Sequence, residues 1–272
     1  QVMFAAELVE KYDVRFDQGT MVPDDDALAD RVFEAGMELA RESGVYCLDT
    51  DRRMVFTQSE LDQALASTPL QVTIGEGDDL VTIVNRKPEE NARVAVNGGP
   101  YGTLVPEEQF IPLMLSYAQE PLIDIIDCAT FVSTHGRPIR ARSPWEAVAC
   151  WQEAKYSFEV IKRAGRPGMA IGAAENGPSE IGELSSLTHG GYRPCDWHRA
   201  SFVSELKVSY AELIKSIHFA HTGAFANNFY NPIYGGYVGG AQGMAVAIAA
   251  GIVLLKACLN GTTYNPGPSH AH

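Results

Sequence analysis

From residue 91 onward, short apolar runs typical of β-strands alternate with longer segments that carry helix signals. The expected strands are residues 93–99, 124–132, 168–173, 195–202, 224–230 and 262–267. The expected helices are residues 106–119, 143–165, 180–187, 204–221 and 240–258. Repeated strand–helix units with short connections indicate an α/β protein with a parallel sheet and right-handed crossovers. The periodicity leaves open whether the sheet is doubly wound or a closed (β/α)8 barrel, for which only five units and one strand are visible.

The best delimited of these helices has signals at both of its ends. Ser143 is placed as the N-cap, Pro144 follows at the first helical position, and Glu146 is spaced to complete a capping box. Gly165 supplies a residue that ends the helix in the left-handed conformation. These signals predict a long helix directly before the strand at residues 168–173.

Residues 1–90 lack this alternation, so we expect them to form an N-terminal cap of helices and a hairpin on a partial (β/α) barrel of residues 91–272. The elements expected in this cap are a helix that ends at Gly44, a second helix that opens with the capping-box pair Thr57 and Glu60, and a hairpin over residues 71–84.

The charge balance excludes some classes of partner. The chain has 272 residues, 21 of them Lys or Arg and 34 Asp or Glu, which gives a formal net charge of -13. Binding to nucleic acid or to an anionic membrane surface needs a basic face, so neither is expected.

The cysteines and the apolar segments predict a soluble cytoplasmic protein. Five scattered cysteines do not suggest a disulfide framework, and no signal peptide is recognisable at the start. Residues 243–255 form the most apolar stretch. It is shorter than the about 20 residues that cross a bilayer, which favours a helix buried against other protein.

In either α/β architecture, functional residues collect just beyond the carboxyl ends of the strands. That rule selects Asn97, residues 133–135, residues 172–175, His198 with Arg199, and residues 228–230. The turn after Gly172 has neither the glycine spacing of a dinucleotide fingerprint nor the Gly-Lys-Ser/Thr of a P-loop. Its carboxylate, Glu175, is placed either to orient or deprotonate a substrate or to cap the next helix.

No metal site is expected. The candidate pairs are Cys195 with His198, His218 with His221, and His270 with His272. A zinc site needs three or four convergent ligands. If residues 195–200 form a strand, Cys195 and His198 point to opposite faces, and the helix that carries His218 and His221 would lie outside the sheet. His270 with His272 is the least implausible pair.

Several longer motifs resemble one known family. The segments SGVYCLDTDR, VNGGPYG, MLSYA, RSPWEAVA, AGRPGMAIG, SELK and PIYGGYVGG recur, in this order and at similar spacing, in the monomethylamine methyltransferase family. The resemblance implies a (β/α)8 barrel of which this chain holds the first five or six strands, with the last strands either missing from the sequence or supplied by another chain. The protein is expected to be a homo-oligomer or to bind a partner chain that completes the barrel. It also implies methyl transfer from a small methylated substrate to cobalamin that a separate corrinoid protein carries, with no cofactor bound covalently here.

The resemblance can be carried to individual positions. The pyrrolysine of the family falls on Gly172, one family glutamate falls on Glu175, and two others fall on Arg199 and Phe229. The chain is therefore identified as a homologue that lacks pyrrolysine and does not demethylate methylamine.

The exchanged positions imply a donor that is N-methylated and carries a carboxylate, as a betaine does. Its catalytic positions would be Glu175 and Gly172. The expected substrate-binding residues are Arg199, His198, Phe229, Asn228 and Asn97. Two alternatives remain open. One is a lyase or hydrolase with Arg199 as anion clamp and Glu175 as base, and the other is a non-catalytic subunit that completes a barrel with a partner chain.

Overall fold

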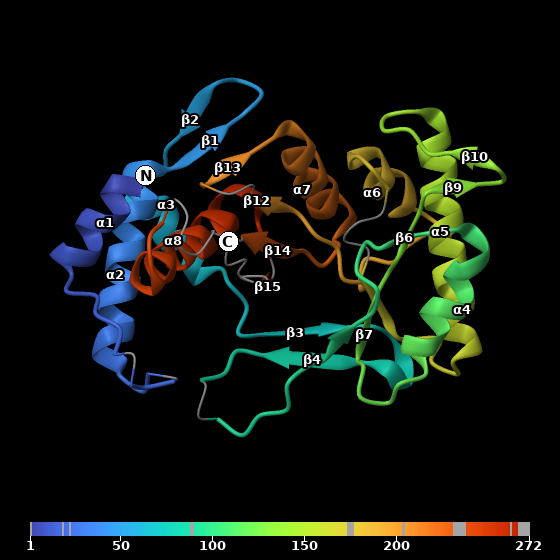
Figure 1. The fold of residues 1–272 in the computed structure, drawn as a ribbon, viewed down its shortest axis with the longest axis horizontal. Helices are drawn as coiled ribbons and strands as arrows, with labels where there is room; N and C mark the ends of the chain where they lie inside the picture. Colours follow the sequence, from blue (N-terminus) through green and yellow to red (C-terminus); the bar gives the residue numbers. More distant parts are fainter. Residues whose placement is uncertain are drawn as a thin grey trace. The chain divides into compact units, whose positions relative to one another are not determined.

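The chain divides into two compact units in a computed structural model, which describes residues 2–17, 19–21, 23–87, 90–172, 177–202, 205–230, 238–261 and 263–265 (Figure 1). The first unit comprises residues 1–68, 200–213 and 228–272, and the second comprises residues 69–199 and 214–227. The predicted boundary at residues 90 and 91 does not coincide with a boundary between these units, because the hairpin at residues 71–84 belongs to the second one.

Helices dominate the first unit. They are α1 (Val2–Lys11), α2 (Asp26–Ser43), α3 (Gln58–Ala66) and α8 (Ala241–Leu259). The ends of α2 and α3 agree with the sequence signals: Gly44 has a φ of 58° directly after α2, and Thr57 and Glu60 form the predicted capping box. In Figure 1, α1 and α2 (blue) lie beside α8 (red), and α8 contacts α1, α2 and α3.

The helix α8 is the apolar segment of the chain. By length and composition it could cross a membrane, but more than half of its most apolar window is buried inside the protein. Its tightest crossing is with α2, where Gly36 approaches Ala249 and Ala250 so closely that a Cβ on Gly36 would lie 2.5 Å from the Ala249 Cβ. The predicted buried helix over residues 240–258 is thus confirmed.

Short strands complete the first unit. They form two sheets, β13 (Lys207–Val208)–β1 (Val45–Cys47)–β2 (Arg52–Met54) and β12 (Ser201–Phe202)–β14 (Asn227–Tyr230)–β15 (Thr263–Asn265). The pairs β1–β13 and β12–β14 are parallel. The predicted helix over residues 204–221 starts too early, because residues 207–208 pair with β1. The helix α7 (Tyr210–Thr222) therefore begins only at Tyr210, whose backbone N–H donates to Asp49 Oδ2.

The second unit contains the longest run of parallel pairing. Its strands are β3 (Gln71–Ile74), β4 (Val81–Val84), β5 (Asn97–Gly98), β6 (Leu104–Val105), β7 (Ile125–Asp127), β8 (Thr130–Phe131), β9 (Ser133–Thr134), β10 (Arg137–Pro138) and β11 (Ala170–Gly172). The predicted hairpin is confirmed by the antiparallel β3–β4 pair. The sheet β11–β7–β5 and the pair β6–β8 are parallel, as predicted for an α/β protein. The described strands do not close into a barrel.

Three strand predictions need correction. The expected strand at residues 195–202 forms only as β12, with isolated bridges at Trp197 and His198 before it. The expected strand at residues 93–99 pairs only as β5. The expected strand at residues 124–132 is split, because Cys128 and Ala129 leave the ladder between β7 and β8. The first carboxyl end along this run is consequently at Asp127 and not beyond Val132.

Three helices complete the second unit: α4 (Glu107–Ala118), α5 (Pro144–Arg163) and α6 (Glu180–Ser186). The predicted ends of α5 are confirmed, since Ser143 Oγ accepts from the Glu146 N–H and Gly165 has a φ of 76°. The predicted capping box is wrong in its second half. The Glu146 carboxylate turns to the backbone N–H of Arg142 and to Ser179, because that pairing joins the start of α5 to the start of α6.

Candidate active site

The three parallel strands of the second unit end at one edge, where polar side chains and glycines gather. Gly172 of β11 lies opposite Asp127 of β7, and an isolated parallel bridge joins Gly172 to Trp197, two residues before Arg199. Parallel sheets in α/β proteins place ligands and catalytic groups at the carboxyl ends of their strands. This strand-end site consists of Asn97, Tyr101, Asp127, Gly172 and Arg199.

A buried ion pair is the central contact of the strand-end site. Arg199 Nη2 donates to Asp127 Oδ1 at 2.8 Å, and the two side chains are 2% and 7% exposed. Burial raises the pKa of Asp127, and this effect outweighs the opposing effects of the Arg199 guanidinium and of a hydrogen bond from Asn97. Removing one partner of such a pair would leave an uncompensated buried charge, which costs about 3–5 kcal/mol.

The cation of this pair also contacts an aromatic ring. The guanidinium carbon of Arg199 lies 4.7 Å from the centroid of the Tyr101 ring, within the range of a cation–π interaction. Tyr101 stands in the turn after β5 with a φ of 35°, and 45% of its surface is exposed. Arg199 therefore connects a buried carboxylate to a ring that solvent can reach.

Two glycines make room for Asp127. A Cβ on Gly172 would overlap Asp127 Oδ1 and would lie 3.1 Å from Asp127 Cγ. A Cβ on Gly99 would overlap the Asp127 backbone, and the φ of 150° at Gly99 also disfavours any other residue. As long as Asp127 keeps its position, the strand-end site has no space for a side chain at residue 172.

The neighbouring His198 lies in a different environment. Its Nδ1 is 2.5 Å from Glu183 Oε1 on α6, and its Nε2 is 2.8 Å from the Arg193 carbonyl oxygen. Burial by itself lowers the pKa of His198. The Glu183 carboxylate raises this pKa by more than burial lowers it, so the net shift is upward. Both ring nitrogens are engaged by the protein, which favours a structural role for His198 over the predicted contact with substrate.

Glu175 lies outside the described residues, so its predicted role stays a prediction. The residues on either side of its segment are described. On one side, Gly172 ends β11 opposite Asp127. On the other side, the Gly177 N–H donates to Thr130 Oγ1 at 3.4 Å. Thr130 Oγ1 in turn donates to Glu153 Oε2 at 3.1 Å. Glu153 is fully buried on α5, and burial raises its pKa to about 8.

Two further predicted residues belong to the first unit. Asn228 and Phe229 follow each other in β14 and are both buried. The Phe229 N–H donates to the Ala200 carbonyl oxygen at 3.1 Å, and the Asn228 side-chain amide donates to the Leu259 carbonyl oxygen at 3.5 Å. Asn97, Gly172, His198 and Arg199 belong to the second unit. The structure therefore brings Asn97, Gly172 and Arg199 together around Asp127.

Within the described ranges, no group of three or more His, Cys, Asp or Glu side chains is arranged to hold a metal ion. Cys195 Sγ donates to Glu76 Oε1, whereas His198 is engaged on both nitrogens, so these two do not share a ligand site. His270 and His272 lie outside the described residues.

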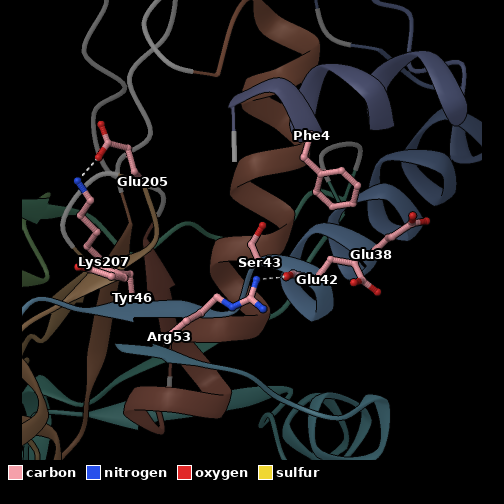
Figure 2. A pocket seen from close by; sticks show the side chains of 8 residues that line it. All are labelled: Phe4, Glu38, Glu42, Ser43, Tyr46, Arg53, Glu205 and Lys207. Atoms are coloured by element: carbon pink, nitrogen blue, oxygen red, sulfur yellow. Dashed lines mark hydrogen bonds and ion pairs between the residues drawn. The ribbon is translucent and has the colours of Figure 1, made fainter. Parts of the chain in front are cut away.

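A hollow in the first unit is shown in Figure 2 and has a volume of about 700 Å³. It is lined by Phe4, Glu38, Glu42, Ser43, Tyr46, Arg53, Glu205 and Lys207. Two of its contacts join lining residues: Lys207 pairs with Glu205, and Arg53 donates to the Glu42 backbone carbonyl oxygen at 2.9 Å. None of the sequence-predicted residues lines this hollow.

Two residues of the strand-end site were not predicted from the sequence. Asp127 was hidden inside the long apolar run at residues 124–132, whose expected end lay beyond Val132. Tyr101 is part of the motif VNGGPYG but was not assigned a role. The sequence does hold a signal for Asp127, because it is an acidic residue in the middle of the otherwise apolar run IIDCATFV.

Comparison with known proteins identifies one family. The family model described as monomethylamine methyltransferase MtmB matches residues 2–272. Monomethylamine methyltransferase MtmB2 of Methanosarcina acetivorans and MtmB of Methanosarcina mazei are each 32% identical to this chain over 268 residues. The match covers 98% of this chain and 58% of each relative, so the chain spans less than two thirds of the length of the curated relatives it matches.

Solved structures of this family have the same fold. The crystal structure of the Methanosarcina barkeri monomethylamine methyltransferase MtmB superimposes with a TM-score of 0.91 at 30% sequence identity. The crystal structure of a hydroxylamine MtmB complex gives the same TM-score and identity. Each superposition covers 96% of this chain and 57% of the other.

Proposed function

Because this chain belongs to the monomethylamine methyltransferase MtmB family, we propose that its protein is a corrinoid-dependent methyltransferase. The methyl donor is a small N-methylated molecule that also carries a carboxylate, such as a betaine, and is not methylamine. The acceptor is the Co(I) corrinoid of a separate corrinoid protein, which acts here as a second substrate. The part of this chain is to bind the donor and to orient its methyl group.

One observation carries this proposal: the buried guanidinium of Arg199 lies at the same strand-end site as Gly172. Glycine has no side chain that could hold a primary amine, whereas a quaternary ammonium donor already has a neutral amine as its leaving group. A guanidinium recognises carboxylates with well-defined geometry, so Arg199 supports a donor that carries one. Among the remaining residues, Glu175 is proposed to face the substrate, with Asn97, Asn228 and Phe229 as further candidates, whereas His198 is assigned a structural role.

The transfer balances without any further reactant. The bond between the nitrogen and the methyl carbon breaks with its electron pair left on nitrogen, so a betaine leaves as the corresponding tertiary amine. The Co(I) centre supplies the electron pair of the new bond to the methyl carbon. The protein holds the two substrates in line for this displacement.

The family fold leads to a proposal for the assembled protein. We place the parallel strands of this chain in a (β/α)8-type barrel that needs further strands, supplied by a longer polypeptide, a partner chain or a second copy. We also propose that the protein is cytoplasmic. Light scattering of the purified full-length protein measures whether it is an oligomer, and co-purification identifies a partner chain.

The experiment mixes the purified full-length protein with a reduced corrinoid protein and one methyl donor at a time. The donors are glycine betaine, other N-, O- and S-methyl compounds, and methylamine. Formation of methylcobalamin is followed by its absorbance. We expect methylation of the corrinoid with a betaine-type donor and none with methylamine.

Two results would overturn the proposal. No methylcobalamin from any donor would exclude corrinoid-dependent methyl transfer. Consumption of a carboxylated compound without corrinoid, followed by proton NMR, would instead support a lyase or hydrolase that uses Arg199 as an anion clamp.

A further inference from the structure

We propose that Asp127 is the carboxylate that faces the cationic nitrogen of the substrate, and that the Asp127–Arg199 pair selects a zwitterion over either single charge. Arg199 has a second task as the positioning residue of Asp127. This inference rests on the proposed function and names the substrate class of that function from the strand-end site. The experiment distinguishes a failure of the inference from a failure of the proposed function.

Asp127 lies next to the position that the resemblance associates with substrate binding. The resemblance puts the substrate-holding group of the family at residue 172, and in this chain the atom nearest to a Cβ at that position is Asp127 Oδ1. The oxygen that covers Gly172 is also the oxygen that Arg199 Nη2 holds at 2.8 Å. A carboxylate therefore occupies the start of the space that a side chain at residue 172 would fill.

The Asp127–Arg199 pair has opposite charges in a buried environment. Asp127 and Arg199 are both almost completely buried, and together they carry no net charge. A ligand with a net charge loses its hydration when it enters such surroundings, and a neutral ion pair does not compensate for that loss. A zwitterion adds no net charge to the site. Its ammonium end is attracted to Asp127 and its carboxylate end to Arg199, so the dipoles of pair and ligand oppose each other.

An aromatic ring lies beside the pair. A quaternary ammonium has no N–H group, so a protein recognises it by Coulomb attraction and by aromatic faces instead of hydrogen bonds. Tyr101 contacts Arg199 through its ring and keeps almost half of its surface exposed. It supplies an aromatic surface at the same strand-end site as the carboxylate.

The test measures binding by calorimetry with the full-length protein and three probes of similar shape. Glycine betaine is the zwitterion, tetramethylammonium carries only the cation, and 3,3-dimethylbutanoate carries only the anion. The wild-type protein is expected to bind glycine betaine about tenfold or more tightly than either of the other two, the size of one charged contact.

Substitutions that remove one charge should change which of the three probes binds most tightly. Asp127→Asn leaves a net positive site, so 3,3-dimethylbutanoate is expected to become the tightest ligand. Arg199→Gln leaves a net negative site, so tetramethylammonium is expected to become the tightest. A purely structural role for the pair would weaken all three probes alike. Asp124→Asn is the matched control, because Asp124 precedes the same strand and pairs with Arg93 away from this site. It should keep the wild-type order.

A lone buried charge can prevent folding, so the double variant Asp127→Asn with Arg199→Gln is measured as well. It removes both charges and is expected to lose the preference for glycine betaine. Retention of that preference, an unchanged order in Asp127→Asn, or no binding of any probe to the wild-type protein would each overturn the inference. Exchange of the order without any methyl transfer would refute the proposed reaction and leave this inference standing. Methyl transfer from glycine betaine with an unchanged order of the probes would support the proposed reaction and refute this inference.

Discussion

Asp127 Oδ1 occupies the space that the Cβ of any side chain at Gly172 would need. The two residues are 45 positions apart in the chain but lie opposite each other in the parallel β7–β11 pair. Arg199 holds the Asp127 carboxylate in this position from the segment that follows β11. The identity of residue 172 is therefore coupled to two distant residues, and a substitution there tests the whole arrangement.

We expect Gly172→Ala to destabilise the protein by about 1–3 kcal/mol, because one extra carbon forces Asp127 out of its position. The backbone of Gly172 is not in the left-handed region, so the cost comes from the overlap and not from φ. Urea unfolding measures the free energy of unfolding of the single variant.

The same substitution in an Asp127→Ala background should cost much less, because the overlapping oxygen is gone. A double-mutant cycle is expected to show a coupling of about 1 kcal/mol or more between the two positions. Additive effects would mean that the carboxylate moves aside freely, which contradicts its tight placement by Arg199.

Local signals predicted those parts of the fold that depend on a few neighbouring residues. The hairpin at residues 71–84 and the ends of α5 at Ser143 and Gly165 formed as expected, since alternation and capping act over one or two turns. The start of α7 was missed because pairing of residues 207–208 with β1 is a tertiary contact. The sequence pattern contains no trace of that contact.

The strand-end site was only partly predictable for the same reason. The rule on strand ends selected Asn97, Gly172 and Arg199, and these three do lie around one point. It missed Asp127, because the end of β7 is set by pairing with its neighbours and not by a turn residue. It also grouped His198 with Arg199, although successive residues of an extended segment point to opposite sides.

Glu153 leads to a prediction on pH dependence. This glutamate is fully buried, and burial raises its pKa to about 8 in the folded protein, against about 4.3 in an unfolded chain. Between these values the folded state keeps a proton that the unfolded state has lost. The contribution of Glu153 to stability is therefore fully present below about pH 4 and is lost as the pH rises towards 8, by up to about 1.4 kcal/mol per pH unit.

The variant Glu153→Gln resembles the protonated acid but cannot ionise, and its carbonyl oxygen can still accept from Thr130 and Phe131. We expect the stability of the variant relative to wild type to increase steadily from pH 5 to pH 8. Urea unfolding at several pH values measures this difference. A difference that does not change with pH would show that Glu153 is ionised in the folded protein.

The pair of His198 and Glu183 predicts the pH dependence of another variant. The pKa of His198 is raised in the folded state, so its contribution to stability is present below the unfolded value of about 6.5 and is lost as the pH rises through the folded pKa. Glu183→Gln removes the carboxylate partner. We expect this variant to be destabilised by about 3 kcal/mol at pH 6 and by clearly less at pH 9.

The role of His198 itself can be separated from that of Arg199. Because both of its ring nitrogens are bonded to the protein, His198→Gln should lower thermal stability and leave the Kd for glycine betaine within about twofold. Arg199→Gln should change that Kd by about tenfold or more. A loss of affinity in the His198 variant as large as in the Arg199 variant would return His198 to the substrate-binding residues.

The crossing of α2 and α8 gives a last prediction, in which two effects have opposite signs. Alanine is a better helix former than glycine by about 1 kcal/mol, so propensity alone predicts that Gly36→Ala stabilises α2. A Cβ on Gly36 would lie 2.5 Å from the Ala249 Cβ and 3.0 Å from the Ala250 nitrogen, so it would force the helices apart. Overpacking costs about 1–3 kcal/mol and should outweigh the gain. We expect a net loss of stability in thermal unfolding, with Asp30→Ala on the exposed face of α2 as a nearly neutral control. A higher melting temperature for Gly36→Ala would show that α8 can move away from α2 without loss.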